Sequence, residues 1–278
     1  MAVKLPVTGE RMMPEMISSV IFVEHLHRYA FASRFCEDKK ILDIASGEGY
    51  GSHILSQSAT SVIGVDIDKE AVKHAAERYK RGNLSFKAGS ADKIPVEDNS
   101  IDVAVSFETI EHHDKHEEMM LEIKRVLKPE GLLIISSPDK KFYSDIPKYK
   151  NPFHVKELYQ HEFDDLLKRH FDNVKMWGQQ SGMLSSLTPV EKGNVGEYWQ
   201  SKGDTGKVEV MNSMSPVFLL ALASQGQIQD TSVSLFDGNS IVEDLNKKIA
   251  DVFRNSRDYR LGNSLLKPLR WVKSVFSK

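Results

Sequence analysis

Between residues 40 and 136, short apolar runs rich in β-branched residues alternate with stretches whose apolar positions repeat at helical spacing. Buried strands are predicted at 41–45, 61–65, 84–87, 101–106 and 132–136. Helices are predicted at 69–81 and 116–127. Because strand–helix–strand units close by right-handed crossovers, this order indicates an α/β domain built on a parallel sheet.

The pattern loosens after the fifth of these strands. A polar loop with three prolines covers 138–152, a helix is predicted at 157–170 and a short strand at 174–177. Residues 178–215 are rich in Gly, Ser and Asn and show little periodicity, so we expect a long excursion on the binding face. A final inner strand is expected at 217–223.

These patterns divide the chain into three parts. Residues 1–38 form an N-terminal lid or helical segment, and 39–224 form the α/β domain, with the excursion at 178–216. Residues 225–278 form a polar linker and a tail that is predicted to be helical from residue 241.

Composition narrows the class of protein. The formal net charge of −2 argues against a nucleic-acid-binding domain, which is usually strongly basic. No apolar run is long enough to span a membrane, and the start of the chain lacks the apolar core of a signal peptide. The single cysteine, Cys36, excludes an internal disulfide. We therefore expect a soluble, cytoplasmic protein.

A glycine-rich turn follows the first strand and carries the strongest chemical signal. Gly47, Gly49 and Gly51 let the backbone turn tightly and approach a ligand without a Cβ in the way. Asp66 ends the next strand, 23 residues after Asp43, where its carboxylate can accept hydrogen bonds from two ribose hydroxyls. A nucleoside-containing cofactor is therefore expected. The G-x-G-x-G spacing differs from the G-x-G-x-x-G of dinucleotide sites, which disfavours a nicotinamide-dependent oxidoreductase.

At these residues the chain resembles the class I S-adenosylmethionine-dependent methyltransferases. The matching segments, in family order, are 43–49 (DIASGEG), 64–66 (GVD), 89–95 (GSADKIP), 100–106 (SIDVAVS) with its exit 107–112 (FETIEH), and 125–131 (RVLKPEG). The resemblance covers roughly 39–224 and implies a seven-stranded, mostly parallel sheet with helices on both faces. It also implies that the last strand is antiparallel.

The resemblance implies a role for each matching residue. Asp43 and the backbone of Ala45, Ser46, Gly47 and Gly49 would hold the methionine moiety of S-adenosylmethionine. Asp66 would hold the ribose. The expected adenine-site residues are Ile67, Ser90, Ala91 and Asp92, and Phe107 borders the cofactor at the exit of the fourth strand. Many relatives have an acidic residue where this chain has Ser90, so Asp92 or a backbone group takes that contact.

The N-terminal segments 8–14 (TGERMMP) and 24–29 (EHLHRY) resemble the entry segment of a methyltransferase subgroup. That subgroup often accompanies bacterial glycosyltransferases in cell-surface polysaccharide pathways. Arg11 or Tyr29 would close over the cofactor carboxylate, since arginine offers it a bidentate fork. The alternative is a helix packed on the sheet edge with Arg28 in solvent.

Two histidines at strand exits are candidates for the base that deprotonates a hydroxyl acceptor. They are His154, in the segment 151–157 (NPFHVKE), and His112, and each is otherwise a hydrogen-bonded structural group. The spacing of Glu108, Glu111 and His112 resembles a divalent-metal cluster of ubiquinone-pathway O-methyltransferases and would suit Mg²⁺. Alternatively, the two carboxylates orient His112 or flank the cofactor, and no metal binds.

The segment 254–278 carries seven basic residues and one acidic residue, with leucines at helical spacing. Such a stretch fits a peripheral contact with the inner face of a membrane, a glycan-assembly partner or a homodimer. The function expected from all these features is methylation of a sugar or surface-polysaccharide hydroxyl. A phenol or quinone O-methyltransferase is the alternative. A non-catalytic module that keeps the fold and binds a partner through its basic tail is the alternative from another class.

Overall fold

The computed structural model describes residues 19–181, 184–190, 198–201, 208–211, 215–229, 232–257 and 259–261. The chain divides into two compact units, Met1–Phe236 and Asp237–Lys278. The first unit holds the α/β domain, and the second contains helix α6 (Asn239–Asn255).

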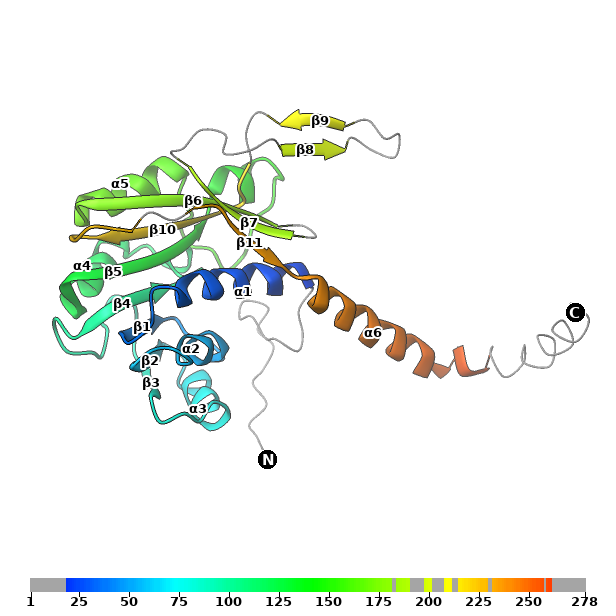
Figure 1. Cartoon of the computed structure of the whole chain (residues 1–278), viewed down its shortest axis with the longest axis horizontal. Helices are drawn as coiled ribbons and strands as arrows, with labels where there is room; N and C mark the ends of the chain where they lie inside the picture. Colours follow the sequence, from blue (N-terminus) through cyan, green and yellow to red (C-terminus); the bar gives the residue numbers. More distant parts are fainter. Residues whose placement is uncertain are drawn as a thin grey trace, which may run out of the picture. The chain divides into compact units, whose positions relative to one another are not determined.

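The first unit alternates strands and helices over most of its length (Figure 1). Its helices are α1 (Ser19–Ser33), α2 (Tyr50–Leu55), α3 (Lys69–Arg78), α4 (His116–Val126) and α5 (Gln160–His170), with single turns η1 (Ile110–His112) and η2 (Lys141–Asp145). Its strands are β1 (Lys40–Ile44), β2 (Ser61–Asp66), β3 (Leu84–Ala88), β4 (Ile101–Ser106), β5 (Leu127–Pro138), β6 (Asn173–Ser181), β7 (Leu184–Pro189), β8 (Tyr198–Ser201), β9 (Val208–Met211) and β10 (Phe218–Ser224), and β11 (Ser234–Asp237) crosses the unit boundary.

The strands form a nine-stranded sheet in the order β11-β7-β6-β10-β5-β4-β1-β2-β3. Strands β3, β2, β1, β4 and β5 pair in parallel, and β10 runs antiparallel between β5 and β6. This confirms the α/β class and the antiparallel inner strand. The expected count of seven strands is wrong, because β7 and β11 extend the sheet beyond β6.

The excursion expected at 178–215 is therefore partly regular structure. Strand β7 pairs antiparallel with β6, and β8 pairs with β9 in a separate two-stranded sheet. Buried Ser185 of β7 stands where an alternating strand would show an apolar residue, which hides the period of two.

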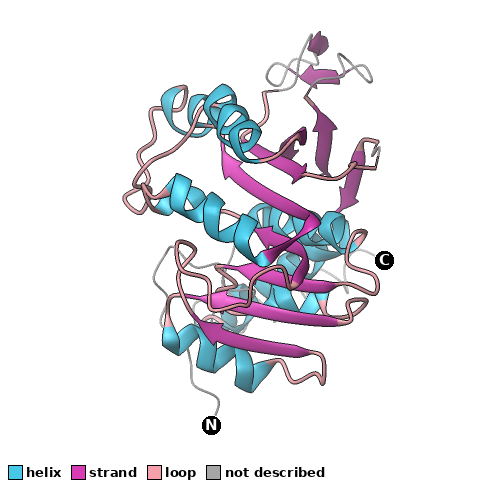
Figure 2. Ribbon diagram, turned by 90° about the vertical axis from the view of Figure 1, so that its left-hand side faces the viewer, coloured by secondary structure: helices cyan, strands magenta, loops and turns pink. Residues whose placement is uncertain are grey.

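Helices cover both faces of the sheet, and each face has its own apolar core (Figure 2). Leu42 of β1 packs in the core that includes Met120 of α4 and Phe163 of α5. Ile41, the preceding residue, packs in the other core with Phe31 of α1 and Leu55 of α2. Because both faces are buried, strands such as β1 read as continuous apolar runs in the sequence.

Helix α1 lies against the sheet and does not leave Arg28 in solvent. The Arg28 side chain is only 1% exposed, and its Nη1 donates to Gln179 Oε1 of β6 at 2.8 Å. Its guanidinium also lies 4.9 Å from the ring centroid of Phe218 in β10. The expectation of a solvated Arg28 is wrong, since one amide and one aromatic ring far along the chain enclose it.

Buried His27 links α1 to the outer strands of the sheet. Its Nδ1 lies 2.9 Å from Ser185 Oγ and its Nε2 lies 3.0 Å from Ser234 Oγ. Burial lowers the pKa of His27 to about 4, and the Arg28 charge adds to this effect. The native state therefore holds this ring neutral at a pH where the unfolded chain protonates it.

We expect His27 to lower the free energy of unfolding as the pH falls below about 6.5, because the unfolded state then binds a proton that the native His27 ring does not bind. The loss assignable to His27 between pH 7 and pH 5 is about 2 kcal/mol. Buried Asp43, whose pKa is raised to about 7, has the opposite effect over this range, so urea unfolding of the wild type and of His27→Gln at both pH values is needed, and the His27 contribution is the change in pH dependence between them. The exposed His161 offers the control, because His161→Gln should leave the pH dependence unchanged.

Within the described residues, none of the helices has the length and apolar character needed to cross a membrane.

Candidate functional site

The candidate site lies along the edge of the sheet where β1, β2, β4 and β5 end. These four strands are parallel neighbours, so the residues that follow each of them meet at one edge. Arg11, one of the residues expected here, lies outside the described residues.

The turn after β1 adopts the conformation that its glycines allow. Ala45, Gly47 and Gly49 have positive φ angles of 57°, 54° and 93°. A Cβ on Gly49 would lie 2.7 Å from the Cβ of Ala75 in α3, so only glycine fits there. Ala45 has no such freedom and holds a strained backbone conformation next to the expected methionine site.

Asp43 near the end of β1 is completely buried beneath this turn. Ser52 Oγ donates to its Oδ2 at 2.6 Å, and Tyr29 Oη donates to its Oδ1 at 3.3 Å. Burial raises the pKa of Asp43 to about 7 even though both hydroxyls favour the ionised form. Asp43 near the end of β1 therefore connects α1 with α2 through two side-chain hydrogen bonds.

Asp66 at the end of β2 faces the same turn. Its Oδ2 accepts from the Gly47 backbone N–H at 2.7 Å, and its Oδ1 accepts from the Asp68 N–H at 2.9 Å. A carboxylate has about four acceptor positions, so two remain for a pair of ribose hydroxyls. The next side chain, Ile67, is 76% exposed, which suits an apolar wall for a purine ring. These residues fit S-adenosylmethionine.

The segment expected to meet adenine is a short turn in which Ser90 forms a bridge with Lys93. Ser90, Ala91 and Asp92 are partly exposed. Asp92 Oδ2 accepts from Lys115 Nζ, and this bond lowers the pKa of Asp92 to about 2. Asp92 is thus ionised at neutral pH and paired with Lys115. This favours the backbone of the turn, rather than the Asp92 side chain, for the adenine contact.

Tyr29 fills the space behind the glycine turn. Its ring packs edge-on against Tyr50 and Phe107, with centroids 5.5 and 5.1 Å away. Gly51 makes room for it, because a Cβ at Gly51 would lie 1.9 Å from Tyr29 Cζ. Ser46 lies in the same buried turn, and its Oγ has no hydrogen-bond partner among the described residues.

We expect Gly51→Ala to destabilise the protein by about 1–2 kcal/mol. Alanine in a helix gains up to about 1 kcal/mol over glycine, but overpacking of this size costs about 1–3 kcal/mol. Tyr29 has no free space to retreat into, since Tyr50, Phe107 and Asp43 surround it. Urea unfolding measures the effect. Gly82→Ala is the control, because a Cβ there meets nothing within 4 Å.

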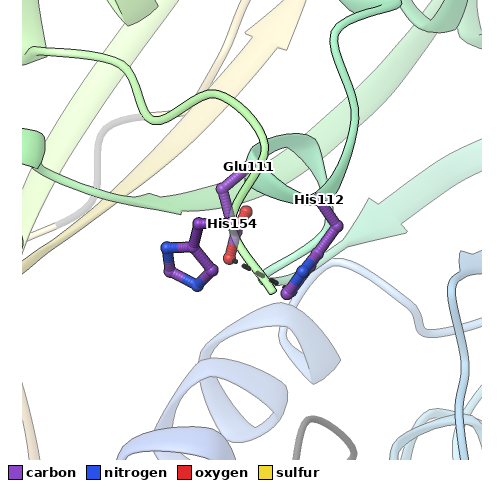
Figure 3. A group of neighbouring side chains, drawn as sticks. All are labelled: Glu111, His112 and His154. Atoms are coloured by element: carbon purple, nitrogen blue, oxygen red, sulfur yellow. Dashed lines mark ion pairs between the residues drawn. The ribbon is translucent and has the colours of Figure 1, made fainter. Parts of the chain in front are cut away.

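A second group of side chains lies where β4 and β5 end (Figure 3). Glu111 and His112 come from η1, and His154 comes from the loop that follows η2. One potential ligand atom of each residue lies within 4.8 Å of the others. Figure 3 shows the Glu111 carboxylate between the two imidazole rings. We call these three residues the Glu–His–His cluster.

Each imidazole of the cluster has an acceptor at its Nδ1. His154 Nδ1 lies 2.5 Å from Glu157 Oε1, and His112 Nδ1 lies 3.1 Å from the Phe153 carbonyl oxygen. Glu111 is buried, and burial together with the nearby Glu108 carboxylate raises its pKa well above the usual range. The arrangement provides two oriented imidazoles beside a carboxylate that is held out of water.

Glu108, the third member of the expected metal set, lies next to the cluster and faces elsewhere. Its backbone has a positive φ of 49°, and its Oε1 accepts from Ser136 Oγ of β5 at 2.6 Å. Arg28 Nη1 lies 3.6 Å from the same oxygen. The structure thus groups His154, rather than Glu108, with Glu111 and His112.

Sequence comparison decides the family. The family described as "Methyltransferase domain" matches residues 36–202, which is more than half of the chain. The chain belongs to this methyltransferase family.

Individual relatives agree with this assignment. The chain is 35% identical over 168 residues to a protein of Mycolicibacterium smegmatis named "Probable S-adenosylmethionine-dependent methyltransferase", covering 59% of this chain and 64% of that protein. It is 36% identical over 179 residues to a Mycobacterium tuberculosis protein of the same description, covering 63% and 64%. The match therefore spans just under two thirds of the length of these relatives.

Solved structures support the methyltransferase fold. A complex between the Haloferax volcanii Trm112 methyltransferase activator and a methyltransferase aligns with a TM-score of 0.53. That alignment is 17% identical and covers 74% of this chain and 92% of the other, so it shows likeness of fold alone.

Three residues of the candidate site were not expected from the sequence. Ser52 binds Asp43 and stands in no motif, and Glu157, which contacts His154, belongs to the segment 151–157 but had no predicted role. Gln179 of β6 binds Arg28 across 151 positions of sequence, a distance that no local pattern reveals. Only the position of Glu157, three residues after a candidate histidine at a strand exit, offered a signal.

Proposed function

We propose that the chain transfers a methyl group from S-adenosylmethionine to a hydroxyl group, and that the acceptor is a sugar of a surface polysaccharide. The proposal rests on one observation, that two groups of functional side chains lie at the same edge of the sheet. The glycine turn with Asp66 lies at the ends of β1 and β2, and an imidazole–carboxylate pair lies at the ends of β4 and β5.

Bound S-adenosylmethionine would supply an electrophilic methyl group on a sulfonium centre. In this proposal Asp66 binds the ribose, Ile67 covers the adenine, and the backbone at Gly47 and Gly49 holds the methionine moiety. Asp43 holds Tyr29 and Ser52 next to that turn through two hydrogen bonds. Alignment of the acceptor with the methyl group can lower the activation barrier by about 7–11 kcal/mol. These positioning contacts therefore matter most.

The acceptor hydroxyl must lose a proton, and the Glu–His–His cluster is placed to receive it. Glu157 accepts from His154 Nδ1, which favours a lone pair on His154 Nε2. The Asn151 side-chain amide now donates to that Nε2 at 2.9 Å, so an acceptor hydroxyl would take the place of this amide. His112 is the second candidate, with its Nδ1 at the Phe153 carbonyl. General-base catalysis of this kind contributes about 10²–10⁴-fold.

The sugar acceptor is supported by the resemblance of the segments 8–14 and 24–29 to a polysaccharide-associated subgroup. A phenol or quinone hydroxyl is the second candidate, and the Glu–His–His cluster favours it if methyl transfer depends on a divalent metal. A non-catalytic module is the alternative from another class, and it predicts weak cofactor binding.

The test uses the purified full chain with methyl-labelled S-adenosylmethionine. Nucleotide sugars and oligosaccharides form one set of acceptors, and phenols and quinols form the other. Label transfer to a sugar supports the proposal, and transfer only to phenols replaces the sugar with the second candidate. If S-adenosylhomocysteine does not bind and no acceptor is labelled, the non-catalytic module is the better description.

We also propose that the basic segment 254–278 docks the protein on an anionic membrane surface. Flotation with anionic and neutral vesicles tests this with the full chain and a chain ending at Phe253. Retained turnover with lost flotation would assign the tail to localisation alone. Unchanged flotation would contradict the docking role.

A further inference from the structure

We propose that Glu111, His112 and His154 bind a divalent transition-metal ion, such as Mn²⁺ or Zn²⁺, through one carboxylate and two imidazoles. Ion binding itself is independent of the reaction. The consequence that the ion holds the acceptor hydroxyl rests on the function proposed above.

The backbone brings the three residues together without any help from an ion. The N–H groups of Val155 and Lys156 both donate to the Glu111 carbonyl oxygen, at 2.8 and 3.1 Å. These bonds fasten the loop that carries His154 to the turn that carries Glu111 and His112. Backbone hydrogen bonds between two chain segments therefore hold the three residues of the cluster near one another (Figure 3).

The hydrogen bonds around both histidines have the pattern found in metal sites. Ligand histidines usually donate one ring N–H to a carboxylate or backbone carbonyl, which leaves the other nitrogen to the metal. His154 Nδ1 faces the Glu157 carboxylate at 2.5 Å, and His112 Nδ1 faces the Phe153 carbonyl at 3.1 Å. These two acceptors favour, in each ring, the tautomer with the proton on Nδ1 and the lone pair on Nε2.

The Nε2 atoms lie on the side of the cluster that this pattern requires. His112 Nε2 is 3.8 Å from Glu111 Oε1. His154 Nε2 accepts from the Asn151 side-chain amide at 2.9 Å, which agrees with a lone pair at that nitrogen, and a bound ion would displace this amide. Ligand atoms around a bound ion lie about 3–4 Å apart, so small side-chain rotations from the present 4.8 Å are sufficient.

Glu111 provides the second, independent observation. Its side chain is only 1% exposed, and its Oε2 has no hydrogen-bond partner among the described residues. The carboxylates of Glu108 and Glu157 lie near enough to act on it electrostatically. An ion bound at Oε2 would give this buried oxygen the partner that it lacks among the described residues. Arg28 is not that partner, because its short contact is with Glu108.

The donor set selects the class of ion. Mg²⁺ prefers oxygen ligands and retains several waters, whereas imidazole suits Zn²⁺, Fe²⁺ and Ni²⁺. Three protein ligands leave a coordination position open, as in catalytic rather than structural sites. At that position the ion would lower the pKa of an acceptor hydroxyl, so that its proton leaves to solvent water instead of to an imidazole that serves as a ligand.

The test measures binding of the metal alone to the full chain after treatment with a chelator. Mn²⁺ binding by electron paramagnetic resonance and Zn²⁺ binding by calorimetry should each show one site, at least tenfold tighter than Mg²⁺. His112→Ala and His154→Ala should each weaken binding at least tenfold. Glu157→Gln should weaken it by about 10–100-fold through the orientation of His154. His161→Ala, on an exposed part of α5, should leave affinity unchanged.

Equal Mn²⁺ and Zn²⁺ binding by the wild type and by a folded His112→Ala/His154→Ala double variant would overturn the proposal. Two outcomes separate it from the proposed function. If methyl transfer persists in excess chelator and no ion binds, the metal site is wrong and the function stands. If the ions bind at the cluster but S-adenosylhomocysteine does not bind the protein, the metal site stands and the function is wrong.

Discussion

Asp66→Ala is expected to weaken the binding of S-adenosylhomocysteine by at least about 100-fold. The substitution removes two charge-assisted hydrogen bonds to the ribose, each worth about 1.5–3 kcal/mol when the partner is charged. It also releases the Gly47 N–H that Asp66 Oδ2 now accepts at 2.7 Å, so the glycine turn loses a support. Calorimetric titration of the wild type and the variant measures the change.

The control for this titration is Asp102→Asn. Asp102 is the second residue of β4, at the opposite edge of the sheet, where it accepts from Lys128 Nζ and from the Lys40 backbone N–H. Its loss should affect stability slightly and affinity not at all. Asp66→Asn keeps the side-chain volume, so a folded Asp66→Asn variant that also binds weakly separates lost charge from a collapsed turn. Wild-type affinity in folded Asp66→Ala would contradict the ribose role.

The placement of Asp43, Asp66 and the glycine turn at one edge of the sheet could be predicted because it depends on local features. Asp43 and Asp66 stand near the ends of apolar runs, and parallel strands bring such ends to one edge whatever the rest of the fold does. The positive φ angles of Gly47 and Gly49 are also local, since glycine is the residue that adopts them without strain.

The outer half of the sheet could not be predicted in the same way, because polar side chains occupy buried positions there. Ser185 is fully buried in β7, where it meets His27 and Gln179, so the strand shows no apolar alternation. The burial of Arg28 could not be predicted for the same reason. Its charge predicts a solvent-exposed side chain, but Gln179 and Phe218, about 150 and 190 positions away in the sequence, contact it from two strands.

The grouping of the cluster is a third case. Glu111 and His112 are visible as a pair in the sequence, and His154 is visible as a separate candidate at the next strand exit. Their junction depends on the hydrogen bonds from Val155 and Lys156 to the Glu111 carbonyl, which join two loops. Loop-to-loop pairing of this kind has no periodicity, so the sequence favoured Glu108 as the third member instead.

His154→Ala is expected to lower the rate of methyl transfer by about 10²–10⁴-fold while leaving S-adenosylhomocysteine affinity within about twofold of the wild type. The reason holds for both roles of the residue. As a base, His154 takes the acceptor proton at Nε2, and as a metal ligand it holds the ion that lowers the pKa of the acceptor hydroxyl. Single-turnover measurements with the acceptor identified in the labelling screen give the rate.

Glu157→Gln distinguishes an oriented imidazole from one that is merely buried. Glutamine keeps the size of the side chain but removes the negative charge 2.5 Å from His154 Nδ1. The rate should fall between those of the wild type and His154→Ala, because the ring remains but its tautomer and direction are less well held. His161→Ala should turn over at the wild-type rate. If folded His154→Ala also does so, neither proton transfer nor metal binding at this ring contributes to the reaction, and the chemistry must then be assigned to His112 and Glu111 alone.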